Sequence, residues 1–296
     1  GSRSTSGGYR ASTTFSPADF SPIVSNEREF DVATAPSEKT DVATAPSEKT
    51  VVPSEGKLDD MIVAVVGASG GVGSATVKAA LAAGLHVRAF ARSREKLNAA
   101  LGESVIDQLD AHVLGDISDP VALDALLSSN AEGNVPEVVL SCLGTPSGAK
   151  PCVRDGTLSL IQAIRRRTDG NSSRGKARLV IISSIGVGDS VAQGLSMDCF
   201  FIRCVKPVCL ARVFADLDRA EEACWLESLE EDGVRCVAVR PPQLKDETGV
   251  GIEAVRLVAS TELKPARRAA IARADVASAM VRLVDPSVFA AWVGKG

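Results

Sequence analysis

The fold of this chain is decided by the stretch Met61–Gly84, which reads MIVAVVGASGGVGSATVKAALAAG. Its first part, MIVAVVG (61–67), is short, continuous and rich in β-branched residues, which is typical of a strand buried in a parallel sheet. Residues 72–83 are predicted to form a helix that Gly84 ends. A strand, a glycine-rich turn and a helix in direct succession form the context in which such a turn binds a diphosphate.

The glycines of this turn are spaced G-x-x-G-x-x-G. We expect Gly67 to permit the tight turn, Gly70 to let the backbone approach a pyrophosphate, and Gly73 to let the helix pack against the strand. The helix N-terminus adds free N–H groups and the positive end of its dipole. The alternative is an ordinary glycine-rich turn. The predicted nucleotide-binding residues are Gly67, Ser69, Gly70, Gly71, Val72 and Gly73.

Strands and helices continue to alternate after this unit. Further strands are expected at 85–92, 111–116, 137–144, 178–184 and 234–242, and helices at 94–101, 120–129, 155–167, 208–231 and 275–283. Asp155 is expected to cap its helix. The alternation predicts an α/β fold with a doubly wound parallel sheet of the Rossmann type, in one domain over residues 59–296.

The end of the second strand indicates which dinucleotide is bound. An NAD site usually has an acidic residue there to bind the ribose 2′-hydroxyl. Here the strand ends in Ala91-Arg92-Ser93-Arg94, and the first acid, Glu95, belongs to the next helix. Arg92, with Arg94 as a second donor, would pair with a 2′-phosphate, so the sequence favours NADP(H) over NAD(H). The alternative is that both arginines are solvated surface charges.

The ends of the next two strands are expected to complete the cofactor site, because ligands bind at the carboxyl ends of the strands in such sheets. Asp116 and Ile117 should lie at the adenine, where the acid accepts from the amine and Ile117 packs on the ring. Leu143, Gly144 and Thr145 should flank the nicotinamide ribose.

The N-terminal residues 1–58 differ from the rest of the chain. They lack apolar periodicity, and the decapeptide DVATAPSEKT occurs at 31–40 and again at 41–50. We expect a disordered tail, because it cannot bury enough apolar surface to offset the entropy of ordering. A protein partner of the tail is one expectation. The acid-poor, Ser/Thr-rich first 16 residues suit a chloroplast or mitochondrial transit remnant as well as a cytoplasmic linker, and secretion is not expected.

Composition narrows the classes of function. The formal net charge of −4 has no basic block, so nucleic-acid binding is not expected. The seven cysteines are an odd number without a C-x-x-C pair, and the two histidines are isolated, which disfavours disulfides and a metal site. No apolar run is long enough to predict a membrane span.

Ordered motifs in the chain resemble the atypical short-chain dehydrogenase/reductase superfamily: GASGGVG, ARSREKL, GDISDP, SCLGTP and ISSIGVGDS. The segments VFADLDRAEE (213–222), VRPPQL (239–244) and IARADVA (271–277) resemble its NAD(P)H-binding group, which includes NmrA-like proteins and flavin/biliverdin reductases. The resemblance covers about residues 61–285. It implies the Rossmann-type fold and a nicotinamide cofactor, and it says little about the substrate.

The resemblance also implies a Ser, Tyr and Lys catalytic set, of which this chain keeps only part. Ser184 matches the serine, and Lys206 takes the place of the lysine. The tyrosine position holds Ile202, and the chain's single tyrosine is Tyr9 in the tail. Alternatively, Ser184 satisfies backbone groups and Lys206 is solvated. Without the tyrosine, alcohol/ketone interconversion loses its proton relay, whereas a conjugated acceptor delocalises the incoming charge and needs less help.

Three other charged groups are expected to have structural roles. The acids and the arginine of one long helix read as a solvated face with pairs along the helix: Asp216, Asp218, Arg219, Glu221 and Glu222. Arg240 should lie where the chain leaves the sixth strand, at the cofactor edge. Arg273 and Asp275 should hold in place the segment that returns to the sheet after residues 243–270.

Three functions are compatible with these features, of which an epimerase or dehydratase of the extended family is the weakest, because such enzymes generally retain the tyrosine. The first is an NADPH-dependent oxidoreductase that transfers hydride to a small conjugated acceptor such as a flavin, quinone or tetrapyrrole-like molecule. The second is a non-catalytic NADP(H)-binding redox sensor or assembly protein.

Overall fold

The computed structural model describes residues 22–25, 61–146, 148–168, 178–197, 210–230, 233–259 and 269–293. Its centre is a parallel sheet in the order β4-β3-β2-β5-β6-β7. The strands are β2 (Ile62–Val66), β3 (His86–Ala91), β4 (Ala111–Leu114), β5 (Val138–Ser141), β6 (Arg178–Ile182) and β7 (Arg235–Val239). The predicted doubly wound Rossmann-type fold is confirmed. The chain reverses its direction of travel across the sheet between β2 and β5, where such folds bind their ligands.

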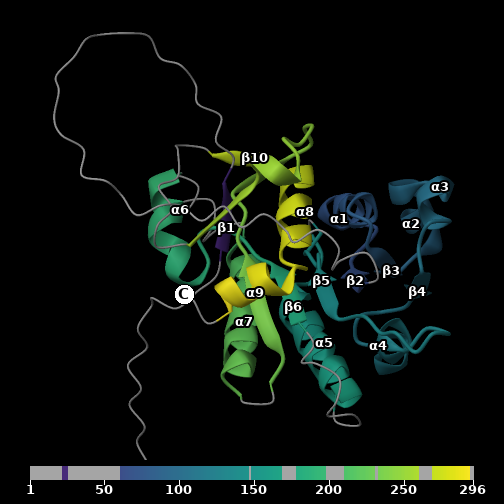
Figure 1. Ribbon diagram of the computed structural model, residues 1–296. Helices are drawn as coiled ribbons and strands as arrows, with labels where there is room; N and C mark the ends of the chain where they lie inside the picture. The colour runs from purple at the N-terminus through teal and green to yellow at the C-terminus, as the bar shows by residue number, and fades with distance from the viewer. Residues whose placement is uncertain are drawn as a thin grey trace, which may run out of the picture.

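Helices cover both faces of this sheet (Figure 1). One face carries α1 (Gly71–Ala82), α8 (Arg273–Arg282) and α9 (Pro286–Trp292). The other carries α4 (Pro120–Leu127), α5 (Val153–Thr168) and α7 (Ala211–Leu229). Shorter helices connect these layers: α2 (Arg94–Leu101), α3 (Glu103–Ile106), η1 (Gly188–Ser190), α6 (Val191–Met197) and η3 (Ile252–Ala254).

The two faces of β2 explain its continuous apolar sequence. Val63 and Val65 pack in the cluster under α1 and α8, whereas Ala64 and Val66 pack in the cluster under α4 and α5. Successive side chains of a strand point to opposite faces, so a strand covered on both faces must be apolar throughout.

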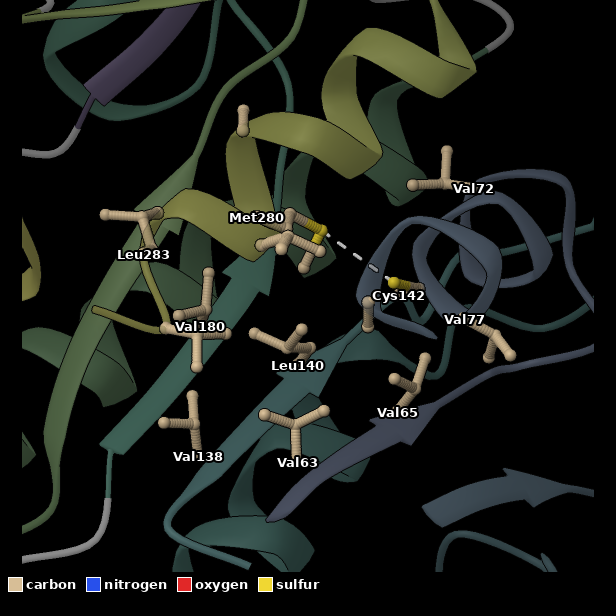
Figure 2. Packing of buried hydrophobic residues seen from close by; sticks show 14 of the residues in the cluster. Val63, Val65, Val72, Val77, Val138, Leu140, Cys142, Val180, Met280 and Leu283 are labelled. Carbon is tan, nitrogen blue, oxygen red and sulfur yellow. Dashed lines mark hydrogen bonds between the residues drawn. The ribbon is translucent and has the colours of Figure 1, made fainter. Parts of the chain in front are cut away.

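A buried thiol joins the core beneath α1 and α8 (Figure 2). The Cys142 Sγ atom lies 3.8 Å from the sulfur of Met280 on α8 and 3.5 Å from the hydroxyl of Thr76 on α1. Burial raises the pKa of this thiol to about 12. Cys142 is therefore a neutral core side chain at physiological pH.

Helix α5 begins earlier than predicted, and its cap comes from another helix. The expected cap, Asp155, lies inside the first turn of the helix, which starts at Val153. The Val153 N–H donates to Asp216 Oδ2 of α7 at 2.7 Å. A capping partner 63 residues away in the sequence leaves no local pattern for a sequence reading to find.

Short strands lie outside the main sheet. β8 (Gln243–Lys245) pairs in parallel with β10 (Ala270–Ala272), and β9 (Arg256–Ala259) pairs with β1 (Pro22–Ser25) in an antiparallel ladder. β1 (Pro22–Ser25) is the part of the predicted tail that the structure describes. Ile23 and Val24 of β1 are β-branched, which favours extended structure. The rest of the predicted tail lies outside the described residues.

Candidate cofactor site

The turn between β2 and α1 is built as its glycines require. Gly67 has a φ of +76°, and a Cβ atom there would lie 2.8 Å from the carbonyl oxygen of Cys142. At Gly73 a Cβ atom would lie 2.1 Å from the Gly67 oxygen. The N–H groups of Gly67 and Ala68 both donate to the Phe90 carbonyl of β3 at 3.1 Å. The backbone therefore folds tightly against two strands, with no room for side chains at Gly67 or Gly73.

This tight packing leaves donors free at the start of α1. Among the groups that the structure describes, no acceptor pairs with the N–H of Gly71, Val72 or Gly73, and no side chain caps the helix at Gly70. Gly70 and Gly71 are exposed, and Ser69 is half-buried. The N-terminus of a twelve-residue helix thus presents unpaired donors and the positive end of its dipole. These properties fit the phosphates of a dinucleotide.

The two arginines after β3 have different environments. Arg92 is exposed and makes no ion pair or hydrogen bond within the described ranges. The hydrogen bonds from Ser118 lower the pKa of Asp116, and the positive charge of Arg92 adds to that effect. The Arg94 guanidinium instead lies 2.9 Å from the His112 ring on β4. Arg92 is therefore the better placed of the two to meet a phosphate.

The expected adenine and ribose residues gather around one glycine of α5. A Cβ atom at Gly156 would lie 2.6 Å from the Leu143 side chain and 3.1 Å from that of Ile117, so these two residues meet there. The Asp116 carboxylate accepts the hydroxyl of Ser118 at 2.6 Å and its N–H at 3.0 Å. These bonds lower the pKa of Asp116, which keeps it charged and able to accept from an amine.

Buried hydroxyls without partners mark the carboxyl ends of β5 and β6. Within the described residues, the hydroxyl oxygens of Ser141, Thr145 and Ser183 are buried and have no hydrogen-bond partner. Ser141 ends β5, Thr145 lies in the loop after it, and Ser183 directly follows β6. Gly144, between the first two, is exposed, and a Cβ atom there would meet nothing within 4 Å. An unpaired buried hydroxyl is costly, so this edge fits a ligand that supplies hydrogen bonds.

The predicted catalytic residues are placed only in part. The Ser184 hydroxyl donates to the Ile185 carbonyl at 3.2 Å, which is the backbone role given above as the alternative. Ser183, which sequence reasoning did not select, has the unpaired hydroxyl. Two consecutive serines after a strand give no signal as to which one is satisfied. Lys206 lies outside the described residues.

The loop after β6 is held by a buried cluster of charges, which corrects the predicted solvated face of α7 at Glu221. Arg240 is 0% exposed, and its guanidinium pairs with Glu221 at 2.6 Å and also with Asp189. The carboxylates of Glu221 and Asp189 are 4% and 5% exposed. Asp218 accepts from the N–H of Gly188 at 3.1 Å. Glu221 thus faces inward and, with the contact from Asp218, fixes the loop that carries Ser183, whereas Arg219 and Glu222 are exposed as predicted.

No group of three or more His, Cys, Asp or Glu side chains that could hold a metal ion occurs among the described residues. None of the helices in the described part of the chain combines the length and apolar character needed to cross a bilayer.

Known structures resemble this one in fold. An anaerobilin reductase from Escherichia coli O157:H7 is 19% identical with a TM-score of 0.53, and the alignment covers 76% of this chain and 91% of that one. A short chain dehydrogenase from Bacillus anthracis is 13% identical with a TM-score of 0.54, covering 79% and 92%. A serine dehydrogenase in its closed form with NADP+ is 17% identical with a TM-score of 0.51, covering 76% and 89%. At these identities the likeness shows the fold alone.

Sequence comparison identifies the family. No curated protein sequence matches the chain. A family model described as NAD(P)H-binding matches residues 67–286, from the first glycine of the turn to the start of α9. The match spans more than half of the chain and includes every motif on which the resemblance rests. The chain therefore belongs to the NAD(P)H-binding family, whose fold is that of the atypical short-chain dehydrogenases/reductases.

Proposed function

We propose that this protein is an NADPH-dependent reductase that transfers hydride to a conjugated acceptor. The observation that carries the proposal is that free N–H groups at the start of α1 occur together with an exposed Arg92 after β3, which has no partner among the residues that the structure describes. The first would hold the diphosphate and the second the 2′-phosphate. Arg94 would act as a secondary donor, and the residues after β4 and β5 would hold the adenine and the nicotinamide ribose.

The lack of a tyrosine acid favours a conjugated acceptor. A nicotinamide bound at this site would supply the hydride, and the chain would orient it against the acceptor. The only tyrosine, Tyr9, belongs to the tail, and the Ser184 hydroxyl is engaged with its own loop. A flavin, quinone or bilin spreads the incoming charge over its own rings, and water supplies the proton. Ser183, with an unpaired hydroxyl at this edge, is the group that would donate a hydrogen bond to the acceptor or the cofactor.

The same absence supports a second candidate, a non-catalytic NADP(H)-binding sensor or assembly protein. The two are separated by following NADPH oxidation with FMN, a quinone and a bilin as acceptors. The bilin is included because one structural neighbour is an anaerobilin reductase. We expect turnover with at least one acceptor. Tight NADPH binding without turnover of any of them would replace the reductase with the sensor.

The preference for NADPH depends on Arg92. Replacing Arg92 with alanine is expected to raise the Kd for NADPH by about 10- to 100-fold, because a charge-assisted hydrogen bond contributes about 1.5–3 kcal/mol. The Kd for NADH should change by less than about 2-fold, since NADH lacks the 2′-phosphate. Titration calorimetry with both nucleotides measures this. Arg94→Ala serves as the comparison and should have a smaller effect, because Arg94 lies against His112. Equal losses for the two nucleotides in Arg92→Ala would refute the assignment.

A further inference from the structure

An arginine from the C-terminal part of the chain lies across the glycine-rich turn. A Cβ atom at Gly71, the first residue of α1, would lie 2.9 Å from both the Cδ and the Nε of Arg273. Arg273 is itself the first residue of α8. The missing side chain of Gly71 is thus what allows the guanidinium end of Arg273 to rest on the start of α1.

The N-terminal ends of α1 and α8 lie together at the contact between Gly71 and Arg273. Figure 1 shows α8 beside α1, and the two helices pack along each other. Their first residues, Gly71 and Arg273, are in contact, and farther along both Thr76 and Met280 reach Cys142. The helices therefore run in the same direction, and their positive dipole ends lie together.

A cation is poorly placed at such a point unless an anion joins it. Helix N-termini disfavour cations, and the first turn of α1 has no acidic residue. The acid in the first turn of α8, Asp275, is buried and accepts from the Val250 N–H at 2.6 Å, so it is committed to the returning segment as expected. The anion that meets the Arg273 guanidinium is Asp246, which follows β8.

The Asp246 carboxylate is weakly held by Arg273, so another anion can replace it. The Asp246 side chain is 86% exposed and that of Arg273 is 30% exposed. A pair in this setting contributes little to stability, because water screens it. A diphosphate on the free N–H groups of α1 would bring two negative charges to the same guanidinium, in the geometry that arginine binds best.

We propose that Arg273 is a diphosphate-binding residue and that Asp246 holds its guanidinium until the dinucleotide replaces the carboxylate. This inference rests on the proposed binding of the dinucleotide at the turn. The exchange gives the pair a second role, because Asp246 follows β8 and Arg273 follows β10, the two strands of the small parallel ladder. Cofactor binding thereby acts directly on the segment after β7, on the acceptor side of the fold.

The alternative is that Arg273 and Asp246 form a purely structural ion pair that holds the end of β8 at the start of α8. A structural pair predicts that removal of either partner has the same consequence, because the same contact is lost. An exchange predicts opposite signs: loss of Arg273 removes a phosphate ligand, whereas loss of the Asp246 charge removes a competitor for that ligand.

The test is titration calorimetry of the full chain with NADPH and NADH, on Arg273→Gln and Asp246→Asn. We expect Arg273→Gln to raise both Kd values by about the same factor, roughly 10-fold, because both nucleotides carry the diphosphate. Asp246→Asn should lower both by about 2- to 3-fold. The matched control is Arg282→Gln at the other end of α8, where the guanidinium donates to the Val255 carbonyl. It should leave both Kd values unchanged.

The outcomes separate this inference from the proposed function. If the unaltered chain binds neither nucleotide, the proposed function fails. If it binds them but Arg273→Gln and Asp246→Asn shift Kd in the same direction, or not at all, the exchange is wrong and the dinucleotide site stands. Should Arg273→Gln not fold, Asp246→Asn decides alone, since its side chain is exposed: tighter binding supports the exchange, and unchanged or weaker binding overturns it.

Discussion

Replacing Arg240 with methionine is expected to lower the free energy of unfolding by about 3–5 kcal/mol, which is the usual cost of leaving buried carboxylates without their cation. Arg240 is the shared partner of Glu221 and Asp189, and all three side chains are almost completely buried. Methionine keeps much of the side-chain volume, so the loss reports mainly on the charge. Chemical denaturation of the purified variant measures the change.

A surface pair provides the control for Arg240. Arg166 lies 2.9 Å from Asp124, and both side chains are about half exposed. Arg166→Met makes the same substitution at an ion pair that water screens, and should cost less than about 1 kcal/mol. Adding Glu221→Gln and Asp189→Asn to Arg240→Met should recover part of the lost stability, because the buried charges are removed with their partner. A cost for Arg240→Met no larger than that for Arg166→Met would contradict the view that the cluster fixes the loop after β6.

Replacing Gly73 with alanine is expected to weaken NADPH binding by more than about 100-fold, because a displacement of about 1 Å in a positioning element has an effect of that size. The added Cβ atom would lie 2.1 Å from the Gly67 carbonyl oxygen, so the start of α1 must move away from the turn. Gly67 cannot adjust, because its own surroundings and its φ of +76° already fix it. Overpacking of this kind also costs about 1–3 kcal/mol of stability. Nucleotide titration and thermal unfolding measure the two effects.

Lys78→Ala is the comparison for Gly73→Ala. It alters an exposed side chain farther along α1, whose amino group donates to the Ala100 carbonyl at 3.3 Å. This variant should bind NADPH as the unaltered chain does. If Gly73→Ala bound NADPH equally well, the first residues of α1 would not be the place where the phosphates are held.

Local patterns sufficed to predict the fold. The six strands of the sheet and its main helices follow from apolar runs and turn residues, within a few positions at most ends. The glycines of the turn could be given roles because their spacing is typical of a strand that turns directly into a helix at a diphosphate site. The short strands β8, β9 and β10 escaped prediction, since three or four residues carry too little periodicity to mark a strand.

The charged residues were harder to predict, for a physical reason. Acids spaced three or four apart on α7 look the same whether they face water or a buried arginine. The partner of Glu221 is Arg240, 19 residues away and directly after β7, and only the packed structure brings them together. Arg88 was missed likewise: it is buried in β3, where Asp110 accepts from it at 2.6 Å. A buried arginine in a strand-like run is visible only once the pairing of elements is known.

The cofactor site likewise contains residues that could be predicted from the sequence and residues that could not. Residues that directly follow strands could be chosen from the sequence, because the carboxyl ends of parallel strands meet at one edge. Arg273 could not be assigned to this site, since its place depends on α8 lying parallel to α1. The hydroxyl of Ser183 could not be distinguished from that of Ser184, because the difference lies in the bonds that the loop makes after it folds.

The most direct test of the account is calorimetric titration of the purified chain with NADPH and, separately, with NADH. Amides at the start of α1 and a guanidinium after β3 predict saturable binding of NADPH that is at least about 10-fold tighter than that of NADH. Heat of binding from neither nucleotide, or equal affinity for both, would contradict it.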